Sequence, residues 1–113
     1  MNISLTQNAL EAVRKLLAAD DRNRAIYVYL AGIGCGGGGK ANFSLMPVKR
    51  TDGERTVEVE GIPFEYDRLI LFHTDRLEID YPYADRGPDV MLELFVIRDA
   101  KRDEIKEGPE GGH

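Results

Sequence analysis

Hydrophobic residues recur at helical spacing near the start of the chain. Leu10, Val13, Leu16 and Leu17 follow one another at intervals that place them on one helix face. Thr6 stands just before this stripe, where a hydroxyl can cap a helix N-terminus. The stripe stops near residue 20 in a polar run. These positions predict one amphipathic helix over residues 7–19.

After the helix, apolar residues alternate with others in several short runs, which is typical of β-strands. Strands are predicted at 26–30, 41–45, 57–59, 77–81 and beginning at 64–66. Pro47 is expected to weaken or end the second strand. Gly61–Pro63 are expected to turn the chain, and Asp67 to cap a short helical turn over 68–74. The almost unbroken apolar run 90–97 predicts a strand buried on both faces.

One helix packed on mostly antiparallel strands predicts an α+β fold with a β-sandwich or barrel-like core. The 113 residues suffice for one domain with its own hydrophobic core. Hydrophobicity falls sharply after residue 98. We therefore expect a domain over 1–98 and a charged, disordered tail over 99–113.

The charge and the hydropathy of the chain exclude some classes of partner. The net charge is −5 and the pI is about 5.0, which argues against nucleic-acid binding as the main role. No apolar run reaches membrane-spanning length, and the N-terminus lacks a signal-peptide pattern. The single cysteine suits a reducing compartment, so a cytoplasmic protein is expected, with no membrane partner.

That cysteine, Cys35, lies in the most unusual stretch of the sequence. Residues 32–40 contain six of the 12 glycines, including Gly34, Gly36 and Gly37. Glycine amides around a sulfur can form an anion-binding nest that favours the thiolate, and Lys40 could add positive charge. The pattern indicates a functional thiol, although lone cysteines in proteins are more often structural.

The order of these segments resembles the HesB/IscA family of A-type iron–sulfur carrier proteins. Four stretches carry the resemblance: Ile3–Thr6 with the helix that follows, Tyr27–Leu30 leading into the glycine-rich loop, 61–67, and Leu77–Tyr81 with its Leu-x-Ile-Asp-Tyr pattern. They span about residues 3–97. The resemblance implies a HesB-like domain, a homodimer, and a non-enzymatic role in iron–sulfur cluster assembly, cluster carriage or iron binding through Cys35. It also implies iron–sulfur assembly proteins or recipient apoproteins as partners.

The chain departs from that family at its end. A-type carriers have a Cys-Gly-Cys motif near the C-terminus, whereas residues 108–113 contain no cysteine. The chain thus looks like a divergent HesB-like member. Since clusters usually have four cysteine ligands, other groups must complete the site. His73 is the first protein candidate and His113 the weaker one; a small thiol or further subunits could also supply ligands.

Other interpretations stay open at this stage. Cys35 could serve thiol-redox or sulfur-handling chemistry without metal, or the domain could be a non-catalytic interaction module. No local base accompanies Cys35, so a hydrolytic enzyme is least favoured and no catalytic residue is assigned. His73 could equally be a surface imidazole. The remaining candidates are expected to be structural: the tyrosines and Met46 in the core, and Asp75, Glu78, Asp80 and Asp85 on a strand's outer face and flanking loops.

Overall fold

The computed structural model describes residues 1–33, 41–51, 53, 55–83 and 89–100. Within these residues one α-helix accompanies seven strands and two short 3-10 helices. Their bounds are β1 Asn2–Leu5, α1 Gln7–Ala18, β2 Ala25–Ile33, β3 Ala41–Val48, β4 Thr56–Val59, β5 Ile62–Tyr66, η1 Arg68–Phe72, β6 Arg76–Asp80, η3 Leu92–Leu94 and β7 Val96–Asp99.

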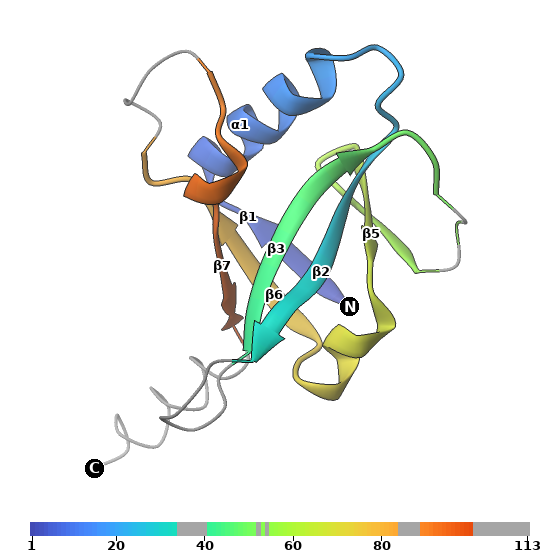
Figure 1. Ribbon diagram of the computed structural model, residues 1–113, viewed down its shortest axis with the longest axis vertical. Helices are drawn as coiled ribbons and strands as arrows, with labels where there is room; N and C mark the ends of the chain where they lie inside the picture. Colours follow the sequence, from blue (N-terminus) through green and yellow to red (C-terminus); the bar gives the residue numbers. More distant parts are fainter. Residues whose placement is uncertain (34–40, 52, 54, 84–88, 101–113) are drawn as a thin grey trace.

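The strands form two sheets. One has the order β3-β2-β5-β4 and the other the order β1-β6-β7. Two neighbouring pairs, β2–β5 and β1–β6, are parallel, while the other three are antiparallel. In Figure 1 the strands β1 and β6 lie behind β2 and β3, and α1 crosses one end of the molecule. The predicted α+β class is confirmed, with two mixed sheets.

Thr6 starts the helix and also fastens it to the second sheet. Its Oγ1 accepts from the Ala9 amide at 3.2 Å, which satisfies one free donor of the first turn. The same hydroxyl donates to Asp80 Oδ1 at 2.6 Å, at the end of β6. The Thr6 amide donates to the Ile79 carbonyl at 3.0 Å. Helix initiation and the β1–β6 pairing are therefore joined at one residue.

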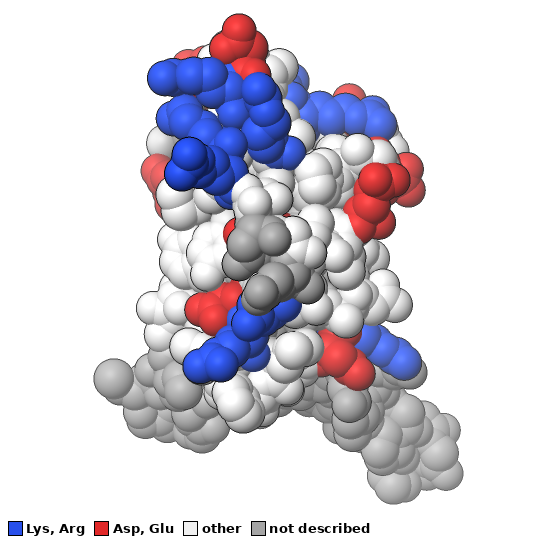
Figure 2. Space-filling view, turned by 90° about the vertical axis from the view of Figure 1, so that its right-hand side faces the viewer, with Lys and Arg blue, Asp and Glu red and all other residues white. Residues whose placement is uncertain are grey.

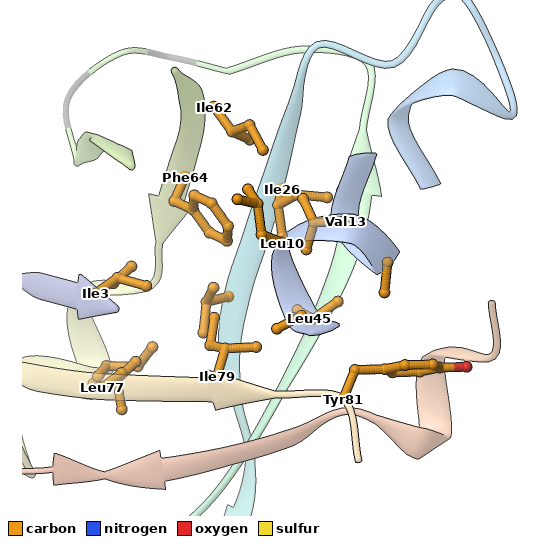
Figure 3. Close-up of a cluster of buried hydrophobic side chains, with 14 residues drawn as sticks. Ile3, Leu10, Val13, Ile26, Leu45, Ile62, Phe64, Leu77, Ile79 and Tyr81 are labelled. Carbon is orange, nitrogen blue, oxygen red and sulfur yellow. The ribbon is translucent and has the colours of Figure 1, made fainter. Parts of the chain in front are cut away.

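The core lies between the two sheets and beneath α1. In Figure 3, Leu10 and Val13 of α1 meet side chains from both sheets, among them Ile26, Phe64 and Ile79. Val13, Ile26, Phe64 and Ile79 are completely inaccessible to solvent. Removing large apolar side chains from water in this way is the main favourable term in folding.

Tyr81 fixes the segment that follows the second sheet's central strand. Its ring is buried and packs on Phe95 with the ring centroids 4.7 Å apart. Its hydroxyl oxygen accepts from the Met91 amide at 3.1 Å. The Asp80 carboxylate accepts from Thr6, and the Tyr81 hydroxyl holds the chain just before η3. Both polar side chains in the run 79–81 therefore have structural partners.

The predicted strand over 90–97 is wrong. The run forms η3 and only then β7, and Met91, Leu92 and Val96 are 47%, 37% and 39% exposed. A continuous apolar run carries no periodicity that separates a strand from a helical turn. In addition, β7 lies at the edge of its sheet, and among the described strands it pairs with β6 on one side alone.

A predicted strand end and a predicted turn also differ from the structure. Pro47 does not end its strand: it lies inside β3, opposite Ile26, and β3 tolerates it because an edge strand needs ladder bonds on one side only. The turn predicted at 61–63 lies one residue earlier. Glu60 and Gly61 have φ of 54° and 79°, the pattern of a type I′ hairpin turn, and Ile62 already pairs with Val59.

Candidate functional site

Cys35 and its neighbours Gly34, Gly36 and Gly37 lie outside the described residues, as does His113. The described strands nevertheless show where the segment that contains Cys35 begins and ends. Ile33 at the end of β2 pairs with Ala41 at the start of β3, so residues 34–40 connect adjacent antiparallel strands. A β-bulge between Leu30 and Gly32 precedes this connection. Bulges increase local twist and are over-represented beside functional sites.

His73 follows η1 and is exposed, as expected for a surface imidazole. Its backbone amide donates to the Ile70 carbonyl at 2.8 Å and ends the 3-10 helix. Asp67 begins that helix by accepting from the Leu69 amide, as predicted, and the Asp67 amide donates to the Val28 carbonyl of β2. The short helix η1 is thus fastened to the same strand that leads into residue 34.

The surface of η1 is unusually apolar. Ile70 is fully buried and anchors it, whereas Leu69, Leu71 and Phe72 are 44%, 48% and 81% exposed. In Figure 1 η1 and the paired ends of β2 and β3 lie toward the same end of the long axis. This end of the molecule therefore presents both an apolar helical turn and the strand ends that border Cys35.

The acidic residues of the second sheet are engaged in structural contacts. Glu78 pairs with Arg98 across the β6–β7 register, and Asp80 accepts from Thr6 and from the Tyr81 amide. Asp85 lies outside the described residues. Over the described part of the chain, no three His, Cys, Asp or Glu side chains gather closely enough to hold a metal ion.

The tyrosines and Met46 only partly follow the expectation of core packing. Tyr81 is buried, but Tyr27 and Tyr29 stack on one another with their centroids 5.8 Å apart, and Tyr83 is 39% exposed. Met46 is 41% exposed and lies opposite Tyr27 in the β2–β3 register. Because Leu45 points into the core, the alternation of the strand turns Met46 outward.

A pocket that sequence reasoning missed lies beside these strands. It has a volume of about 430 Å³, which is within the range of small-ligand sites. Its walls are Tyr27, Val48, Arg55, Glu65, Tyr66, Asp67 and Arg68. These residues come from four separate parts of the sequence and share no motif, so only the folded sheet brings them together.

Comparison with known proteins supplies the fold relationship. No family model matches the sequence, and no curated protein matches it significantly. Among solved structures, the chain is similar to Escherichia coli SufA, described as involved in biosynthesis of iron–sulfur clusters. The alignment covers 88% of this chain and 82% of SufA, with a TM-score of 0.62 and 18% sequence identity. The chain shares the fold of SufA. This agrees with the HesB-like domain that the sequence resemblance implies, at the level of fold.

Among the described residues, no helix has the length and apolar character needed to cross a membrane.

Proposed function

We propose that this protein binds an iron–sulfur cluster or iron as cargo through Cys35 and acts in cluster assembly or carriage without catalysing a reaction. The observation that carries the proposal is the fold shared with SufA over 88% of the chain. The position of Cys35 in the sequence supports it, because the only thiol of the chain lies in the glycine-rich connection between the paired strands β2 and β3.

One thiolate per chain is too few for a cluster that usually has four cysteine ligands. We propose that two copies share the cargo in a homodimer, with His73 completing the ligand set. Two cysteines and two histidines would match the ligand count of Rieske-type clusters. The exposure of His73, and the position of η1 toward the same end as the strand ends bordering Cys35, support this assignment. The expected partners are iron–sulfur assembly proteins or recipient apoproteins in the cytoplasm.

Anaerobic reconstitution with ferrous iron and sulfide tests this proposal. The wild type should develop visible absorption with equimolar iron and sulfide, and Cys35→Ser should stay colourless. His73→Ala should bind less cluster, whereas the matched control His113→Ala should bind as much as the wild type. Equal iron in the wild type and Cys35→Ser would show that the metal is adventitious. Equal binding by all histidine variants would remove His73 from the ligand set.

A metal-free outcome would favour the thiol-redox alternative only if the Cys35 thiol is acidic. The pKa of the Cys35 thiol is obtained directly from alkylation rates of the apoprotein measured against pH. A thiol pKa near the ordinary 8.5 would leave neither metal nor redox chemistry supported at Cys35.

A further inference from the structure

Two loops that are distant in sequence meet at the end of the molecule opposite the strand ends bordering Cys35. The first joins α1 to β2, and the second follows β3. The Arg24 amide donates to the Val48 carbonyl at 2.8 Å, and Lys49 Nζ lies 3.7 Å from Asp20 Oδ2. These contacts bring together four cations, here called the basic patch: Arg22, Arg24, Lys49 and Arg50.

Figure 2 shows the side of the molecule that lies at the right in Figure 1, and Lys and Arg side chains gather at its upper end. Such a cluster is notable in a chain with a net charge of −5. The side chains are open to solvent: those of Arg22 and Lys49 are 71% and 54% exposed, and Arg24 and Arg50 are exposed residues. The patch is therefore available to a partner.

Two described carboxylates, Asp20 and Asp21, lie in the same loop as Arg22 and Arg24, so the four cations outnumber them. Asp20 is shared between Arg22, at 2.9 Å, and Lys49. The Arg22 hydrogen bonds, aided by Lys49, lower the pKa of Asp20 to about 2, so Asp20 is shared as a carboxylate between these two cations. Arg24 donates to the backbone carbonyls of Asp21 and Asn23, which hold its guanidinium in place without cancelling its charge. Arg50 has no ion-pair partner among the described residues.

The 430 Å³ pocket adjoins the patch. Val48 lines the pocket, its carbonyl accepts from Arg24, and Lys49 is the next residue. The pocket walls include the Tyr27 and Tyr66 rings, which offer apolar area to a partner's side chain. The other walls carry two cations and two carboxylates, from Arg55, Arg68, Glu65 and Asp67. A recess that contains two tyrosine rings, beside a group of exposed cations, suits an acidic peptide that carries one bulky residue.

We propose that the basic patch and its adjoining pocket bind an acidic segment of a partner protein, with a bulky side chain of that segment in the pocket. A protein segment fits better than a nucleic acid, because the patch is small and the rest of the acidic chain would repel a long phosphate backbone. The same repulsion disfavours an anionic membrane. This proposal concerns the metal-free protein and does not depend on cluster binding at Cys35.

Fluorescence anisotropy with a labelled acidic heptapeptide, glutamate and aspartate around one central phenylalanine, tests the proposal. The metal-free protein should bind it, and binding should weaken as salt rises from about 50 to 200 mM. Arg50→Glu and Arg24→Glu should each weaken binding about tenfold. Arg14→Glu, the same charge change on an exposed position of α1, should weaken it less than about threefold. A peptide with alanine in place of phenylalanine should bind more weakly.

Several results would overturn the proposal. Equal losses in Arg50→Glu and Arg14→Glu would mean that only net charge matters. Tighter, patch-dependent binding of a single-stranded oligonucleotide or of anionic vesicles would assign the patch to another class of partner. Patch-dependent self-association in sedimentation experiments, without peptide binding, would make a second copy of this chain the occupant. Equal affinity for the phenylalanine and alanine peptides would exclude the pocket from the site.

Discussion

Replacing Thr6 with valine should destabilise the whole domain, because one hydroxyl serves two elements. It caps α1 through the Ala9 amide and donates to Asp80 Oδ1 at 2.6 Å. Loss of an N-cap costs about 1 kcal/mol. A hydrogen bond to a charged group contributes about 1.5–3 kcal/mol, and the lower end applies because this pair is only partly buried. The free energy of unfolding should therefore fall by about 2.5 kcal/mol.

Urea unfolding followed by circular dichroism at 222 nm measures this loss. The midpoint should fall by about 1–2 M, given an m-value typical of small domains. Thr6→Ser is the matched control, since it keeps the hydroxyl and should lose less than about 1 kcal/mol. A double-mutant cycle with Asp80→Ala should give a coupling energy above about 0.5 kcal/mol. The reasoning fails if Thr6→Ser is as destabilised as Thr6→Val, or if the cycle shows no coupling.

Two further predictions concern the loops. The folded-state pKa of Asp20, about 2, lies below the ordinary 3.8, so the stabilisation from its charge is complete above about pH 4 and is lost as pH falls toward 2. The thermal midpoint of the wild type should consequently fall more over that interval than that of Asp20→Asn, and parallel curves would contradict the assignment. Gly61→Ala adds a β-carbon to a residue with a φ of 79°, and this backbone strain should lower stability by about 1 kcal/mol. Space is not the obstacle, because beyond the adjacent residues no atom lies within 4 Å of the added β-carbon. Unchanged urea stability would show that the β4–β5 turn readjusts.

Local chemistry explains which elements the sequence could predict. The helix predicted over 7–19 forms over Gln7–Ala18 because its apolar spacing and its Thr6 cap agree. Asp67 begins η1 as predicted for the same reason, since a side-chain acceptor satisfies the first free amides. Where a periodic pattern and a terminal signal coincide, the element follows from a few neighbouring residues.

Long-range pairing explains what the sequence could not predict. The edge position of β3 lets Pro47 stay within a strand, and the edge position of β7 leaves Val96 partly exposed. Nothing local to either segment indicates how many neighbouring strands it will have. Asp80 likewise looked like an outer-face carboxylate, and its bond to Thr6 appears only when β6 pairs with β1.

The candidate functional residues also divide into those that the sequence reveals and those that only the fold brings together. Cys35 and its glycines are visible as a motif, because an unusual composition needs no fold to be recognised. The basic patch and the pocket are assembled from separate loops and strands, whose charged residues look like ordinary mixed surface in the sequence. The β2–β3 and β2–β5 pairings create both features.

The most direct test of the central claim is native mass spectrometry of the anaerobically reconstituted protein. Cluster binding through Cys35 predicts an assembly with the mass of two chains plus one iron–sulfur cluster, absent from Cys35→Ser. That result would establish the cargo, its thiol ligand and the number of subunits that share it. A wild type that carries no iron or sulfide, or a Cys35→Ser variant that carries the same cluster, would contradict the account.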